Sequence, residues 1–99
     1  MKRYRFEADA AVEFDVESAF QWYEIEEPGL GYDFLGQLRS CYERLLRTPY
    51  AFQELRSGVR RALTKQFPYA VYISIEDNTV LILAVVHTAR DPAEWQLRL

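Results

Sequence analysis

The spacing of apolar residues changes along the chain and divides it into helical and extended parts. From Ala10 to about Glu27, and from about Tyr32 to Thr48, apolar residues recur every three or four positions, which predicts two amphipathic helices. Before the first helix and after Gly58 the pattern alternates or becomes continuously apolar, as is typical of strands. The sequence therefore predicts an α+β domain with the element order β-α-α-β-β-β.

Polar and conformationally restricted residues mark the ends of the two helices. Asp9 is a plausible N-cap for the first helix, Pro28-Gly29 ends it, and Pro49 stops the second. The short connection predicts an antiparallel helical hairpin. The apolar stripes of the two helices comprise Val12, Val16, Ala19, Phe20 and Tyr23, and then Phe34, Leu35, Leu38, Cys41, Tyr42, Leu45 and Leu46.

The extended segments predict an antiparallel meander that follows a first short strand at Arg3–Ala8. Its first strand contains Arg60, Arg61 and Lys65, the second runs from Tyr69 to Ile75, and the third from Thr79 to Val86, ending on the only histidine, His87. Phe67-Pro68 and Asp77-Asn78 separate these strands, and both links are too short for a parallel crossover. Residues 50–58 are predicted to form a loop. We expect the helical hairpin to cover the apolar face of this sheet.

Composition fits one small globular domain over residues 1–99. The chain has 49% hydrophobic and 15% aromatic residues, which is enough to form a core. One cysteine excludes an internal disulfide and a cysteine-based zinc site. No apolar run approaches the length of a membrane span, and the N-terminus lacks the apolar centre of a signal peptide, so a cytosolic protein is expected.

Charge is unevenly distributed, although the total is only −3. Residues 1–36 contain three basic and nine acidic groups, whereas residues 37–67 contain seven basic and two acidic groups. This asymmetry indicates either two solvated helix faces of opposite sign or a basic middle that meets an anionic partner. The acidic total argues against a general nucleic-acid binder.

Few residues have the pattern of a catalytic centre. The chain has no metal-ligand cluster and no phosphate-binding glycine loop, so no cofactor is expected. His87 is either a general acid or base, or a structural residue at a strand end; the structural role is favoured. Arg61 and Lys65 share one strand face and Arg60 lies on the other, so these cations either bind an anionic partner or form internal ion pairs. Tyr69 and Tyr72 point to opposite faces, and Trp95 either covers the sheet or contacts a partner.

Several strings in order resemble the RelE/ParE superfamily of bacterial type II toxins, and the ParE-like branch most closely. They are WYEIEEPGLGYDFL at residues 22–35, Arg60-Arg61-x-Leu63, Phe67-Pro68-Tyr69-x-Val71-Tyr72, and His87-x-x-Arg90-Asp91-Pro92. The resemblance implies a strand, a helical hairpin and an antiparallel meander. It also implies a toxin neutralised by a cognate antitoxin, which would wrap around it with a segment that folds on binding.

The superfamily contains two activities, and the resemblance leaves both open, as well as a toxin-like domain that has lost its activity and only binds the antitoxin. ParE-like members inhibit DNA gyrase by binding, whereas RelE-like members cleave mRNA on the ribosome. We expect the first activity, with partner contacts from Arg60, Arg61, Lys65, Tyr72, His87, Arg90 and Trp95. In the alternative, an mRNA endonuclease, Arg61, Lys65, His87 and Arg90 would hold the phosphate and move the proton. Tyr69 stands where endonuclease members commonly have arginine, which favours the ParE-like activity.

Overall fold

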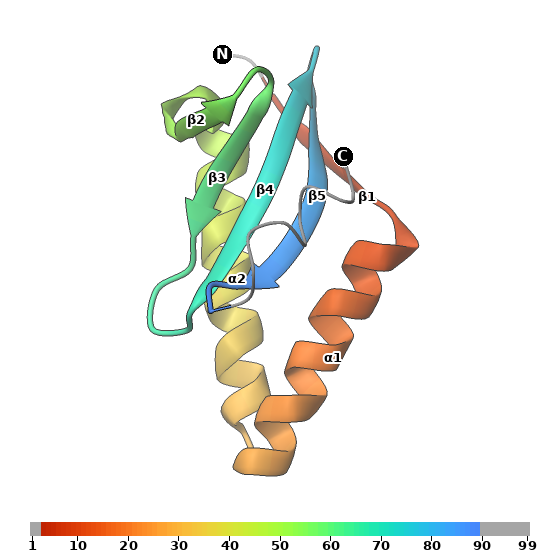
Figure 1. Cartoon of the computed structure of the whole chain (residues 1–99), viewed down its shortest axis with the longest axis vertical. Helices are drawn as coiled ribbons and strands as arrows, with labels where there is room; N and C mark the ends of the chain where they lie inside the picture. Colours follow the sequence, from red (N-terminus) through yellow and green to blue (C-terminus); the bar gives the residue numbers. More distant parts are fainter. Residues whose placement is uncertain (1–2, 90–99) are drawn as a thin grey trace.

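The computed structural model describes residues 3–89, which form two helices packed on one sheet (Figure 1). The strands are β1 (Arg5–Ala8), β2 (Gln53–Arg56), β3 (Val59–Leu63), β4 (Tyr69–Glu76) and β5 (Thr79–His87). The helices are α1 (Ala10–Glu26), α2 (Leu30–Arg47) and the short 3₁₀ helix η1 (Pro49–Ala51). The predicted α+β class and helical hairpin are confirmed. Neither helix is both long enough and apolar enough to cross a membrane.

The sheet has the strand order β1-β5-β4-β3-β2 and is mixed. The meander β3-β4-β5 is antiparallel, as predicted. β1 pairs in parallel with β5, with Arg5 opposite Thr79 and Ala8 opposite Ile82. The prediction of an antiparallel sheet therefore holds for the meander and is wrong for β1. The parallel pairing is possible because the helical hairpin provides the long crossover that a parallel connection requires.

The segment predicted as a loop, residues 50–58, contains η1 and β2. β2 pairs antiparallel with β3, and the two strands are joined through Gly58, whose φ of 81° is left-handed. The prediction of a loop was wrong because Gln53–Arg56 has one apolar residue and no alternating pattern. The prediction that Lys65 belongs to the first strand of the meander is also wrong. β3 ends at Leu63, so Lys65 lies in the exposed turn that follows.

Local contacts fix both ends of the helical hairpin. The Asp9 carboxylate accepts a hydrogen bond from the Val12 N–H at 3.1 Å and caps α1, as predicted. At the other end, a Glu24 carboxylate oxygen accepts from the N–H groups of Gly29 (2.9 Å) and Gly31 (2.8 Å). A negative side chain at a helix N-terminus also complements the helix dipole. The last turn of α1 therefore holds the first turn of α2.

The main core lies between the helices and the sheet. It includes Phe34, Cys41 and Leu45 of α2, all fully buried, with Val71 and Ile73 of β4. A second buried cluster, on the opposite face of the sheet, comprises Val59, Ala70, Tyr72, Ala84 and Val86. Tyr69 belongs to the first cluster and Tyr72 to the second, which confirms that they point to opposite faces.

Candidate functional site

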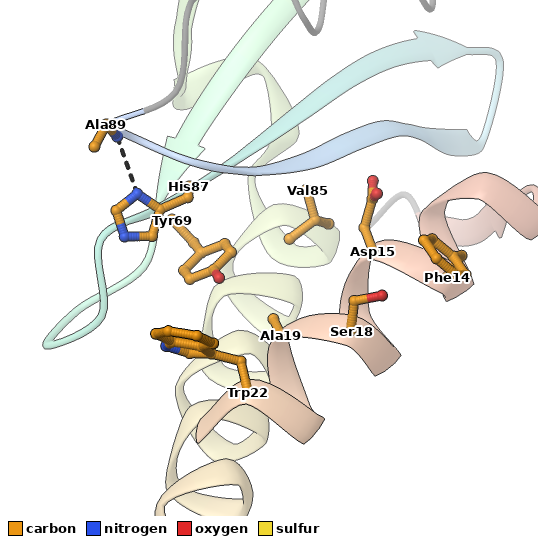
Figure 2. A pocket seen from close by; sticks show the side chains of 9 residues that line it. All are labelled: Phe14, Asp15, Ser18, Ala19, Trp22, Tyr69, Val85, His87 and Ala89. Carbon is orange, nitrogen blue, oxygen red and sulfur yellow. Dashed lines mark hydrogen bonds between the residues drawn. The ribbon is translucent and has the colours of Figure 1, made fainter. Parts of the chain in front are cut away.

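A cleft of about 540 Å³ lies between α1 and the ends of β4 and β5, and Figure 2 shows the side chains that line it. One wall is a face of α1 and the other is the helix-facing side of the two strands. Phe14 and Trp22 of α1 are 71% and 60% exposed, although both are large apolar side chains. The lining residues are Phe14, Asp15, Ser18, Ala19, Trp22, Tyr69, Val85, His87 and Ala89.

His87 lies at the mouth of this cleft, where β5 ends. Its Nδ1 accepts a hydrogen bond from the Ala89 N–H at 3.1 Å, so in the neutral ring Nε2 carries the proton. The ring packs edge-on against Tyr69, with the centroids 5.3 Å apart. Within residues 3–89 no carboxylate forms an ion pair with His87. These contacts place the imidazole as a hydrogen-bonding residue at the end of a strand.

The inner wall of the cleft is a group of packed aromatic rings. Tyr69 is 7% exposed and lies 4.9 Å from Phe34 and 6.3 Å from Tyr23, measured between ring centroids. Burial raises the pKa of Tyr23, and a side-chain hydrogen bond with Tyr69 lowers it by a smaller amount. The Tyr23 hydroxyl thus remains neutral at physiological pH. Aromatic rings therefore pack behind Tyr69 at this wall, which suits it to contact apolar groups of a ligand.

Arg60, predicted as a partner-binding residue, has internal partners. Its Nη1 donates to the carbonyl oxygens of Phe52 at 2.7 Å and Tyr50 at 3.2 Å. The guanidinium lies 5.2 Å from the Tyr50 ring centroid and 3.7 Å from the Glu54 carboxylate. Arg60 therefore attaches η1 and β2 to β3.

Arg61 and Lys65 occupy different surroundings from Arg60 and from each other. Arg61 points to the sheet face opposite the helices, beside Tyr72 of β4, and its Nη2 lies 3.4 Å from the Gln53 Oε1. Lys65 is exposed at a small hollow of about 270 Å³ that it shares with Arg44 and Arg47 of α2. The sequence predicted that Arg61 and Lys65 share one face of the same strand, but β3 ends at Leu63 and Lys65 lies beyond it.

Two residues of the endonuclease alternative, His87 and Arg61, do not come together. His87 pairs in register with Tyr69 and shares the helix-covered face of the sheet, whereas Arg61 pairs with Tyr72 on the other face. The sheet itself thus lies between the imidazole and this guanidinium. Residues 3–89 also contain no cluster of three histidine, cysteine or acidic side chains able to hold a metal ion. Arg90 and Trp95, the other predicted site residues, lie outside the described residues.

Sequence reasoning missed the exposed wall of the cleft. Ser18 has an ordinary helical explanation, and the pattern of the core stripe does not include Phe14. The available signal was a second apolar stripe on α1, formed by Phe14, Trp22 and Ile25 on the side opposite the core stripe. An amphipathic helix normally has one apolar side. A second one indicates a surface available for contact.

Comparison with known families gives a match over most of the chain. The family model of the ParE toxin of the type II toxin–antitoxin system parDE matches residues 6–92. The chain belongs to the ParE toxin family. It is therefore a ParE-type toxin of a type II toxin–antitoxin system, and the resemblance to the ParE-like branch is confirmed. A search of curated proteins gives no match.

A solved structure supports the ParE fold. The structure described as the chromosomal ParDE TA system from P. aeruginosa is similar, with a TM-score of 0.75 and 11% sequence identity. The match covers 86% of this chain and 96% of that chain. At this identity the likeness concerns the fold, and it shows that the ParE arrangement of two helices on a sheet persists when few side chains are shared.

Proposed function

We propose that this ParE-type toxin inhibits growth by binding a protein target, DNA gyrase by analogy with its family, and that a cognate antitoxin neutralises it. The observation that carries the proposal, beside the family, is the separation of Arg61 from His87 by the sheet. Cleavage of RNA by this chain would need a cation at the phosphate and a proton-transfer group within hydrogen-bonding reach of the same bond. Binding to a protein has no such requirement.

Charge also favours a protein target. Affinity for a nucleic-acid backbone is largely electrostatic, and this chain has a net charge of −3. Arg60, one of the seven cations in residues 37–67, is occupied by two backbone carbonyls and by Glu54. Of the others, Arg44, Arg47 and Lys65 line one hollow, whereas Arg61 lies on the sheet face opposite the helices. This spread suits a partner that follows the surface better than a single bound phosphate.

Antitoxin binding is the second part of the proposal. The exposed Lys65 and the neighbouring Arg44 and Arg47 offer positive charge to acidic groups of an antitoxin. Arg61 and Tyr72 remain candidate contacts on the face away from the helices. The toxin and its antitoxin would meet in the cytoplasm, which is also the expected location of the target.

The test is induction of the toxin alone, with DNA breakage and translation followed separately. We expect early gyrase-linked DNA cleavage and, with purified components, inhibition of gyrase supercoiling. Coexpression of the protein encoded by the adjacent short reading frame should restore growth. Rapid translation arrest with mRNA cuts at codon boundaries, in the absence of gyrase-linked breaks, would overturn the gyrase proposal.

Variants at the endonuclease residues sharpen this test. His87→Ala and Arg61→Met should each leave growth inhibition within about threefold of wild type, since an essential general acid or base contributes about 10²-fold or more. Each variant should be checked for folding by circular dichroism. Complete loss of toxicity in a folded His87→Ala protein, with mRNA cleavage by the wild type, would instead support the enzyme.

A further inference from the structure

Three large apolar side chains of α1 lie exposed in one line. Phe14, Trp22 and Ile25 are 71%, 60% and 80% exposed, and their helical spacing places them on one face of the helix, which we call the exposed stripe. Figure 2 shows Phe14 and Trp22 on this side of α1, with Ser18 between them. The buried Val12 belongs to the core face of the same helix. Packing of α1 on the sheet therefore does not account for the exposed stripe.

The spacing of the exposed stripe suits a partner helix. From Phe14 through Ser18 and Trp22 to Ile25 the steps are four, four and three residues, which is the period at which one helix packs along another. The stripe is about 16 Å long, so a helical segment of about 12 residues covers it. Phe14, Ser18 and Trp22 also line the cleft of about 540 Å³, which leaves space beside the small Ser18 for a large side chain of the partner.

The charge around the exposed stripe specifies the partner further. α1 has five carboxylates and no lysine or arginine. Helical spacing places Glu17 on one side of the stripe and Glu26 on the other, and both residues are exposed. Within residues 3–89 neither carboxylate forms an ion pair with a basic side chain. A partner helix with lysine or arginine on both sides of its apolar residues therefore complements both margins of the stripe.

Two other occupants fit this surface less well. A second copy of α1 would bring the carboxylates of two acidic helices together, and like charges across an interface repel. The acidic groups of an antitoxin match the hollow at Arg44, Arg47 and Lys65, which has the opposite charge and lies on α2 and the turn after β3. Surfaces of opposite charge on different elements suit two partners of opposite charge.

We infer that the exposed stripe of α1 contacts the protein whose inhibition stops growth, through an amphipathic helix of that protein. The apolar side of this helix packs on Phe14, Trp22 and Ile25, and its lysine or arginine residues lie beside Glu17 and Glu26. The inference rests on the proposed function, because it requires a protein target, and it adds the contact surface and the chemistry of the partner. It does not require that the target be gyrase.

Induction of variants in growing cells tests the inference. Phe14→Gln combined with Trp22→Gln removes most of the stripe and should raise the toxin level needed to stop growth by about tenfold or more. Glu17→Lys combined with Glu26→Lys keeps the stripe and reverses the charge of its margins, and should raise that level by about threefold or more. Tyr32→Gln, at a 67% exposed position of α2, is the matched control and should change it by less than about twofold. Immunoblots measure the toxin levels.

Antitoxin affinity of the purified variants separates loss of the target contact from loss of the fold. Isothermal titration calorimetry should give values within about threefold of wild type for both stripe variants, with unchanged circular dichroism. Full toxicity of both stripe variants would overturn the inference. A matching loss of antitoxin affinity in folded stripe variants, or an equal loss of toxicity in the Tyr32→Gln control, would overturn it as well.

Failure of the gyrase assignment gives a different result. Growth arrest by the wild type without gyrase-linked DNA breaks would reject gyrase as the target, whereas the stripe variants would still lose toxicity against the protein that is inhibited. Gyrase-linked breaks produced equally by the wild type and by the stripe variants would reject the exposed stripe and leave the gyrase proposal in place.

Discussion

Two adjacent arginines of β3, Arg60 and Arg61, have very different surroundings. Arg60 and Arg61 have the same chemistry, yet alternation along β3 directs them to opposite sides of the sheet. Arg60 reaches two carbonyl oxygens, an aromatic ring and a carboxylate, and 20% of its side chain is exposed. Arg61 reaches Gln53 only at 3.4 Å. Their contributions to stability should therefore differ strongly.

Arg60→Met should lower the free energy of unfolding by about 1–3 kcal/mol, because two carbonyl oxygens lose a charged donor. Arg61→Met is the matched control and should change it by less than about 0.5 kcal/mol. Urea unfolding followed by circular dichroism measures both values. Equal effects of the two substitutions would show that the Arg60 contacts contribute little.

Tyr42 provides a second prediction at this scale, in its dependence on pH. Burial, and then the nearby charges of Cys41 and Asp15, raise the pKa of Tyr42 to about 12 from an ordinary value of 10.0. When the pKa of a group is higher in the folded chain than in the unfolded chain, its contribution to stability is complete below the unfolded-state pKa. That contribution is lost as pH rises to the folded-state pKa. The free energy of unfolding should thus fall by about 2 kcal/mol between pH 10 and 12 from this residue.

Tyr42→Phe isolates that contribution, since it keeps the ring that packs 4.9 Å from Phe6 and removes the hydroxyl. The free energy of unfolding of each protein is measured as a function of pH. Subtracting the values of the variant from those of the wild type should show the predicted fall in stability. Spectroscopic titration of the tyrosinate absorbance gives the pKa directly. A difference profile that stays flat up to about pH 12 would contradict the raised pKa.

At the scale of elements, the helical hairpin depends on close approach at one glycine. A Cβ at Gly31 would lie 2.7 Å from the Phe20 carbonyl oxygen and 2.8 Å from its Cδ1, and the backbone oxygen cannot move aside. A Cβ at Gly36 of the same helix would meet no other atom within 4 Å. Replacing each glycine by alanine should therefore have opposite effects on the stability of the fold.

Gly31→Ala should destabilise the fold by about 2 kcal/mol or more, since it separates the helices and disturbs the Glu24 cap. Gly36→Ala should stabilise it by about 0.5–1 kcal/mol, because alanine favours an exposed helical position. Thermal and urea unfolding of the two variants provide the comparison. Stabilisation by Gly31→Ala would mean that the hairpin relaxes without cost.

Elements with a strong local pattern were predictable, and those that depend on distant partners were not. Apolar spacing with Asp9, Pro28 and Pro49 was enough to define both helices. β2 was missed because its pairing depends on Arg60 and Gly58 more than on its own residues. The parallel pairing of β1 joins residues 74 positions apart, as in the contact from the Arg5 Nε to the Thr79 hydroxyl, which no local pattern specifies.

The candidate site was predictable only in part, for a similar reason. Tyr69 and His87 were found as residues of interest, but the cleft needs the far side of α1 to face them. Phe14 and Trp22 have helical spacing, which by itself indicates core as readily as surface. Only their exposure in the folded chain separates the two interpretations.

At the scale of the whole molecule, positive and negative charge lie on different elements. The acidic α1 contrasts with the basic end of α2 and the turn at Lys65. The antitoxin contact proposed for the basic region should therefore be sensitive to charge reversal there and insensitive to charge removal on α1. Added salt should reduce the difference between these two effects on antitoxin affinity.

Arg61→Glu combined with Lys65→Glu should weaken antitoxin binding by about tenfold or more at low salt. Glu13→Gln combined with Glu17→Gln is the control of equal size and should change affinity by less than about threefold. Isothermal titration calorimetry at two salt concentrations measures both. An unchanged affinity of the reversed variant would place the antitoxin contact elsewhere on the toxin.

The parallel pairing of β1 with β5 has a consequence for how the toxin is made. Arg5–Ala8 precedes the helical hairpin in the chain, but its neighbour Thr79–Ile82 follows the hairpin and the strands β2, β3 and β4. During synthesis the helical hairpin can form first, but β1 cannot pair until β5 has been made. A chain under translation therefore exposes the pairing edge of β1 until β5 has been made, and any surface that depends on the complete sheet exists only after that step.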